Sequence, residues 1–141
     1  RELPAGDDGT IAVPAAADGS YCVGLEWPER RLVRRIGLRF ADAGAVPPPD
    51  RVRVEFWQGE SAWQGTWKPL QGSIERTADA LTASVNFAAN PDARGGIQKI
   101  RWLLPPSDRA PRLRRLSAHT ASSMATVRQA VRSSRASRAH Q

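Results

Sequence analysis

Three tryptophans lie close together in the stretch 52–70: Trp57, Trp63 and Trp67. An indole ring offers a broad apolar face and one N–H donor, so such a cluster serves either as a core anchor or as a recognition surface. Trp57 follows a run of alternating apolar residues, and its side chain should emerge on the face opposite to them or at the end of the strand. Trp63 lies in a polar loop without a periodic apolar partner. Trp67 opens the next expected strand, and we expect it in the core.

Polar side chains around this cluster could complete a carbohydrate site. An exposed indole stacks on the apolar face of a sugar ring while neighbouring side chains form hydrogen bonds with the hydroxyls. One alternative stays open: Trp63 folds back onto the end of the domain or packs on a neighbouring domain. The candidate ligand-binding residues are Trp63, Trp57, Gln58, Glu60 and Gln64.

Catalytic chemistry finds little support in the sequence. Cys22 is the only cysteine, and its strand-like setting favours a small hydrophobic role. A thiol nucleophile would need a histidine brought close by the fold, and the only histidines are His119 and His140. Carboxylates that could pair, such as Glu26 and Glu29, lie beside expected turns. We therefore expect a protein that is not an enzyme.

Asp7 and Asp8 are the candidate metal ligands. With carbonyl groups of a glycine-containing turn they could help to hold a structural calcium ion, although no loop carries a complete set of oxygen ligands. A solvated acidic turn is the simpler interpretation. We expect no other cofactor.

The chain is basic, with a formal charge of +7 and a pI of about 11.1. Four arginines at 128, 132, 135 and 138 account for +4 of that charge, which leaves +3 for residues 1–120. The charges of the main body are mixed in sign. Nucleic-acid binding through an arginine surface and the tail therefore ranks third, after a carbohydrate-binding module and a purely structural module in which Trp57 and Trp63 pack on a partner domain. No apolar run is long enough to span a membrane.

Period-two alternation, interrupted by Pro, Gly and Asp clusters, predicts several short strands. Three consecutive prolines make 41–50 a loop, and 58–66 is expected to connect two strands. Short strands at such spacing indicate an all-β fold, an antiparallel sandwich or a barrel. The expected strands are 21–27, 33–40, 52–56, 67–70, 81–87, 98–104 and 112–118.

The 141 residues suffice for one domain with a single core. We divide the chain into an N-terminal edge segment (1–19), a β-sandwich domain (20–120), and a basic linker or frayed helix (121–141). In the last part Met124, Val127 and Val131 fall at helical spacing.

Four segments between about 20 and 120 give the chain a family resemblance. They are YCVGLEWPERRLVRRIGLRF, RVRVEFWQGESAWQGTWKPLQG, GGIQKIRWLLPP and RLRRLSAHT. In this order they resemble the discoidin-like branch of the galactose-binding-like β-sandwich domains. The resemblance implies a jelly roll that acts as a non-catalytic carbohydrate-binding module and binds glycans through loops at one end.

The same resemblance implies a place within a larger, exported bacterial protein. It points to an extracellular or periplasmic location, with an adjacent catalytic or structural domain in the same polypeptide as a further partner. The sequence begins at Arg1 and its first residues show no signal-peptide pattern. We therefore expect a piece of a longer protein.

Overall fold

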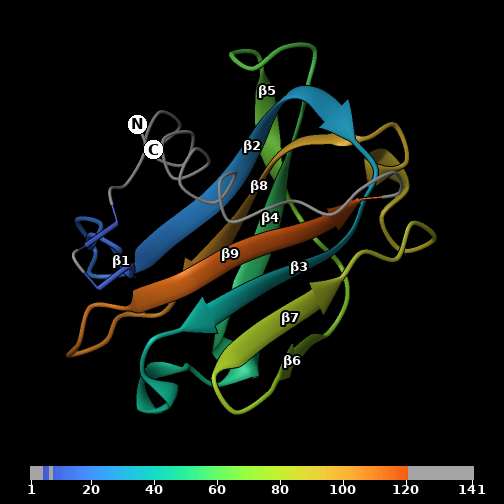
Figure 1. Ribbon diagram of the computed structural model, residues 1–141. Helices are drawn as coiled ribbons and strands as arrows, with labels where there is room; N and C mark the ends of the chain where they lie inside the picture. The colour runs from blue at the N-terminus through green and yellow to red at the C-terminus, as the bar shows by residue number, and fades with distance from the viewer. Residues whose placement is uncertain (1–4, 7, 121–141) are drawn as a thin grey trace.

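The computed structural model describes residues 5–6 and 8–120 and shows an antiparallel β-sandwich. Sheet A has five strands in the order β1-β9-β3-β7-β6, and sheet B has four in the order β2-β8-β4-β5. Sheet A lies nearer to the viewer in Figure 1, with sheet B behind it. The predicted all-β sandwich is confirmed. The strands are β1 (Ile11–Ala12), β2 (Tyr21–Arg31), β3 (Val33–Phe40), β4 (Arg53–Gly59), β5 (Gly65–Pro69), β6 (Ile74–Arg76), β7 (Ala80–Ser84), β8 (Ile97–Leu104) and β9 (Arg112–Thr120).

The core forms because alternate residues of each strand face the opposite sheet. Ile36 and Leu38 of β3 face inward from sheet A, and Ile100 and Trp102 of β8 face inward from sheet B, each no more than 1% exposed. Trp27 is also 1% exposed, so the expected burial of Trp27 and Trp102 is confirmed. The outward positions of the same strands carry mostly polar, charged or small residues, with Leu103 of β8 as an exception, and these give each sheet an outer face.

The connections follow the local sequence closely. The proline-rich segment 41–52 contains two short 3-10 turns, η1 (Ala43–Ala45) and η2 (Pro49–Arg51). A third, η3 (Pro91–Ala93), lies in the loop before β8. β2 continues past Pro28 to Arg31, with an irregular pairing to β8 after Glu26, whereas the sequence predicted its end at Trp27. A strand can carry proline at such an irregularity because the ladder hydrogen bond is already interrupted there.

One hairpin extends beyond the rest of sheet B. β4 and β5 pair from Glu55 and Pro69 up to Gly59 and Gly65, so their turn is shorter than the predicted loop 58–66. Figure 1 shows this β4–β5 hairpin projecting at the top of the molecule, past the neighbouring ends of β2 and β8. The fold therefore presents residues 59–65 at one end of the sandwich.

The N-terminal segment forms an edge of sheet A. β1 pairs with β9 through Ile11 and Leu113, and isolated bridges join Ala5 to Ile11 and Ala15 to Tyr21. The predicted helix or linker at 121–141 lies outside the described residues. Within the described part of the chain, no helix has the length and apolar character needed to cross a membrane.

Candidate functional site

The strand register places Trp57 and Trp67 together on the outer face of sheet B. They are directly opposite each other in the β4–β5 ladder, and their ring centroids are 5.4 Å apart at an interplanar angle of 73°. Trp57 emerges opposite to the core, as predicted. The expectation that Trp67 lies in the core is wrong: Trp67 is half-buried on the outer face, because its pairing with Trp57 fixes the phase of β5.

Two cations of β8 cover these rings. The Lys99 ammonium lies 4.3 Å from the centroid of Trp57, and the Arg101 guanidinium lies 4.0 Å from that of Trp67. Both distances suit cation–π attraction. Indoles and cations therefore interleave across three strands on one face of sheet B.

Lys99 also connects the hairpin turn to the sheet. Its side chain is fully buried, and Nζ donates a hydrogen bond to the carbonyl oxygen of Ala62. Burial lowers the pKa of Lys99 below 10.5, and the nearby carboxylate of Glu26 opposes part of that effect. The turn is thus held back against the outer face of sheet B.

Hydrogen bonds fix the conformation of the hairpin turn. Trp57 Nε1 donates to the carbonyl oxygen of Ser61 at 2.9 Å, and Ser61 Oγ accepts from the backbone N–H groups of Trp63 and Gln64 at 3.1 Å each. In this arrangement the Trp63 side chain is 79% exposed, the highest exposure among the large hydrophobic residues that the structure describes. An ordered turn therefore presents an indole to the solvent.

A hollow of about 470 Å³ lies beside the hairpin, between it, the end of β2 and the loop that contains η3. We call it the hairpin hollow. Arg30 closes one side by donating to the Gly59 carbonyl oxygen at 2.5 Å, and Lys68 forms an ion pair with Asp92 at 3.6 Å. The hollow is lined by Arg30, Trp57, Gln58, Gly59, Glu60, Thr66, Lys68, Asp92 and Gly96.

The structure separates the predicted ligand-binding residues into two groups. Trp57, Gln58 and Glu60 line the hairpin hollow, whereas Trp63 and Gln64 are exposed on the turn and do not line it. Sequence reasoning missed the other charged and polar lining residues. Arg30 and Asp92 come from distant segments and carry no local signal, but the alternation of Thr66 and Lys68 in β5 could have placed both on the face opposite to Trp67.

The lining of the hairpin hollow offers donors and acceptors of both charges. Arg30 and Lys68 donate, Glu60 and Asp92 accept, and the Gln58 amide does both. A ligand rich in hydroxyl groups, each of which also donates and accepts, matches such a lining better than a strongly anionic or a purely apolar one.

The calcium prediction rests on two aspartates, of which Asp7 lies outside the described residues. The carboxylate of Asp8 accepts hydrogen bonds from the Thr10 N–H and hydroxyl groups at 3.1 and 2.7 Å, and it forms an ion pair with Arg112 at 3.3 Å. The bonds from Thr10, followed by Arg112, lower the pKa of Asp8 below 3.8. Among the described residues no group of three or more His, Cys, Asp or Glu side chains could hold a metal ion. The calcium site stays a prediction.

The fold separates the two residues that a thiol–imidazole pair would need. Cys22 is in β2 of sheet B, whereas His119 is in β9 of sheet A, where its Nε2 lies 3.4 Å from an Arg35 nitrogen. His140 lies outside the described residues. The described residues therefore assemble no cysteine–histidine nucleophile.

Comparison of the chain with protein-family models and with curated proteins finds no match.

Proposed function

We propose that this chain is a non-catalytic accessory module of a larger polypeptide and binds carbohydrate at the hairpin end of the sandwich. The observation that carries the proposal is the position of Trp63. It is 79% exposed on a turn fixed by Ser61 and Lys99, beside a polar hollow of about 470 Å³. A rigidly presented indole next to convergent polar groups is the arrangement that saccharide recognition needs.

The two parts of the site have different tasks in this proposal. The Trp63 indole stacks on the apolar face of one sugar ring. Gln58, Glu60 and Lys68 form hydrogen bonds with hydroxyl groups of a neighbouring ring in the hairpin hollow. Because the Ser61 bonds order the turn before binding, little conformational entropy is lost when the ligand arrives.

A glycan array followed by calorimetry on the best ligand tests the proposal. We expect Trp63→Ala to weaken binding by about ten-fold, which corresponds to ~1.4 kcal/mol, within the range of aromatic stacking. Leu32→Ala is the matched control, because Leu32 is the other large hydrophobic residue among those described that is exposed, at 42%. It should leave the affinity unchanged.

An array without any bound glycan would reject the carbohydrate site. Equal losses in the Trp63 and Leu32 variants would also reject it, because the effect would then not be specific to the hairpin.

The second candidate function is a structural module that packs on a neighbouring domain through the same indole. The exposure of Trp63 favours it equally, since a large exposed aromatic residue is also typical of an interface core. Hydroxyl-radical footprinting of Trp63 in the longer polypeptide separates the two functions. Protection without added glycan supports packing, and protection only with glycan supports the carbohydrate site.

A further inference from the structure

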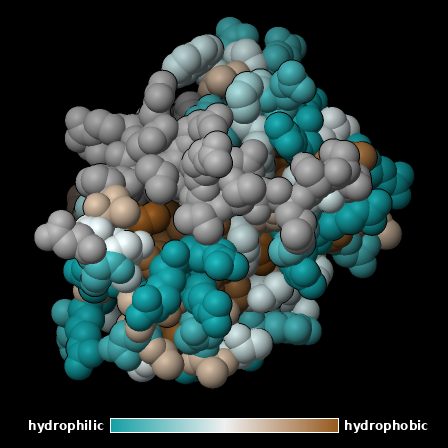
Figure 2. Space-filling model, in the orientation of Figure 1, coloured by the Kyte–Doolittle hydropathy of each residue, from teal (hydrophilic) through white to brown (hydrophobic). Residues whose placement is uncertain are grey.

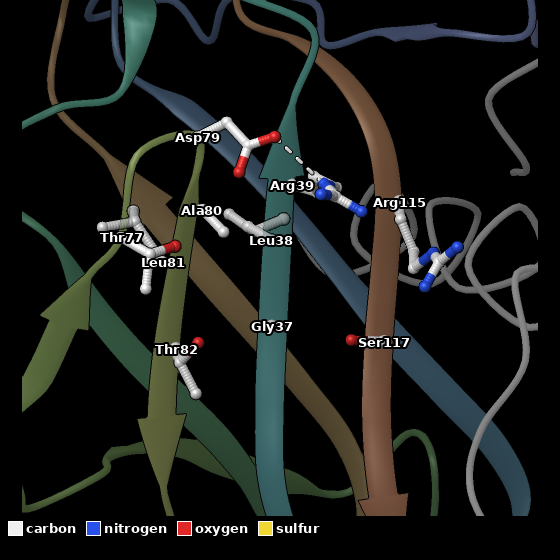
Figure 3. A pocket seen from close by; sticks show the side chains of 10 residues that line it. All are labelled: Gly37, Leu38, Arg39, Thr77, Asp79, Ala80, Leu81, Thr82, Arg115 and Ser117. Carbon is white, nitrogen blue, oxygen red and sulfur yellow. Dashed lines mark hydrogen bonds and ion pairs between the residues drawn. The ribbon is translucent and has the colours of Figure 1, made fainter. Parts of the chain in front are cut away.

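We propose that the outer face of sheet A binds the carboxylate or sulfate group of an acidic oligosaccharide, at a second site on the sheet opposite to the hairpin hollow. This site is a hollow of about 220 Å³ centred on Gly37 of β3, which we call the Gly37 hollow. Figure 3 shows Thr82 and Ser117 on the two strands that flank Gly37, with Arg39, Asp79 and Arg115 toward one end.

The floor of the hollow exists because a central strand lacks a side chain. β3 pairs with β7 and β9, and Gly37 is directly opposite Thr82 on one side and Ser117 on the other. A Cβ atom at Gly37 would lie 2.9 Å from Ser117 Oγ. A glycine inside a central strand weakens the strand and marks a place of close approach. Here the whole row across three strands carries only small side chains.

Arginines border this row along β3 and β9. Arg35, Gly37 and Arg39 share one face because they are two residues apart. In the register of β3 and β9, Arg39 is directly opposite Arg115. Like charges directly opposite each other destabilise a sheet.

Among the residues that the structure describes, only one of these two opposed arginines has an acidic partner. Arg39 Nε donates to Asp79 Oδ2 at 3.0 Å, as the dashed line in Figure 3 marks. Arg115 forms no hydrogen bond or ion pair with any residue in the described part of the chain, and the hydroxyl groups of Ser117 and Thr82 donate none there. The hollow is thus lined by two arginines, two hydroxyl donors and the Asp79 carboxylate. Because Asp79 is bound to Arg39, the Arg115 guanidinium and the two hydroxyl groups are left to match an oxyanion.

A second hollow extends this surface across β7 to β6. Its volume is about 260 Å³, and it shares Thr82 with the Gly37 hollow. Its other lining residues are Gly72, Ser73, Glu75, Ser84 and Asn86, which offer hydroxyl, amide and carboxylate groups. On the side shown in Figure 2, hydrophilic side chains cover much of the surface over β3, β7 and β6.

The two hollows together fit one class of ligand better than another. A single inorganic ion fills only the basic end, whereas a saccharide chain with one acidic group places that group at Arg115 and its hydroxyl groups along Thr82 and Glu75. The ligand is therefore an oligosaccharide that carries a carboxylate or a sulfate. The site does not depend on the glycan site at the hairpin.

NMR titration of the full 141-residue chain tests the assignment, with calorimetry for the affinities. The probes are tetragalacturonate for carboxylate, a carrageenan tetrasaccharide for sulfate, neutral neoagarotetraose, inorganic sulfate and a short DNA duplex. We expect one acidic saccharide to shift the amide signals of Gly37, Thr82 and Ser117, and the neutral saccharide to leave them in place. The saccharide that binds more tightly identifies the acidic group.

Variants on β9 provide a matched comparison. Arg115→Gln should weaken acidic saccharide binding by about ten-fold or more, because it removes a charge-assisted donor. Arg114→Gln makes the same charge change at the adjacent, exposed residue that does not line the hollow, and it should change the affinity by less than about two-fold. Trp63→Ala should have no effect, which separates this site from the one at the hairpin.

Several results would overturn the proposal. The first is that neither acidic saccharide shifts the amide signals of Gly37, Thr82 and Ser117. The second is that the Arg115 and Arg114 variants lose the same amount of affinity. The others are that inorganic sulfate binds as tightly as the saccharides, or that DNA binds more tightly than they do and depends on Arg115. The amide shifts of the wild-type chain on addition of saccharide test the proposal even if the Arg115→Gln variant fails to fold.

Discussion

The contact of Arg101 with Glu55 should stabilise sheet B measurably. Arg101 Nε and one of its terminal nitrogens donate to Glu55 Oε1 at 2.9 and 2.6 Å, and the two side chains are only 14% and 20% exposed. The same guanidinium lies 4.0 Å from the Trp67 ring centroid. One side chain of β8 thus connects β4 and β5.

The expected magnitude follows from this partial burial. An exposed ion pair contributes ~0–1 kcal/mol, whereas breaking a buried one costs ~3–5 kcal/mol. The pair lies between these limits, so we expect Arg101→Met to lower the free energy of unfolding by about 2 kcal/mol, including ~0.5–1 kcal/mol for the contact with Trp67. A double-mutant cycle with Glu55→Gln should give a coupling energy of about 1–1.5 kcal/mol.

Equilibrium unfolding in urea, followed by far-UV circular dichroism, measures these free energies. Arg53→Met is the matched control, because Arg53 is an exposed arginine of β4 that forms no ion pair in the described part of the chain. It should cost less than about 0.5 kcal/mol. A coupling energy below about 0.5 kcal/mol, or one that disappears in about 0.5 M NaCl, would refute the reasoning, since only an exposed pair is screened so strongly.

Three further predictions concern pH and the hairpin turn. Because burial lowers the pKa of Lys99, the free energy of unfolding should rise with pH from that lowered pKa up to 10.5, and urea titrations of Lys99→Met should lack this rise. Because hydrogen bonds from Thr10 lower the pKa of Asp8, the stability that Asp8 contributes is present above pH 3.8 and is lost as pH falls through the lowered pKa. Acid titration of Asp8→Asn should therefore show a smaller loss of stability than the wild-type chain. An equal loss in both would contradict the assignment. Gly65→Ala should lower the free energy of unfolding by about 1–3 kcal/mol, because the new Cβ would overlap the backbone carbonyl oxygen of Gln58 and lie 2.7 Å from the Gly59 Cα and 2.9 Å from the Trp57 ring. A loss below about 0.5 kcal/mol in thermal unfolding would contradict this.

Strands with a long, regular alternation could be predicted from the sequence. Val33–Phe40 was predicted with the bounds that the structure shows, because four apolar residues face the core within it. β1 and β6 were not predicted, since they contain only two and three residues and too few side chains to show a period.

Only those side-chain positions of the candidate site that depend on the alternation within a single strand could be predicted from the sequence. The outward position of Trp57 follows from the inward phase of Val54 and Phe56. The phase of Trp67 depends on the cross-strand register, which no residue within β5 reveals. The burial of Lys99 was missed for a related reason: a lysine is rarely buried, and here the hairpin turn folds over it.

The position of β9 has a consequence for folding kinetics. This strand lies between β1 and β3 in sheet A. Residues near the start of the described chain therefore find their hydrogen-bond partners only near the end of that chain. Asp8 and Arg112, for example, are 104 positions apart. Closing so large a loop before any contact is gained slows folding, and sandwiches with such non-local pairing fold in milliseconds to seconds. Until β9 docks, the edge of β3 stays open to pairing with another chain, and this open edge is an aggregation hazard during folding.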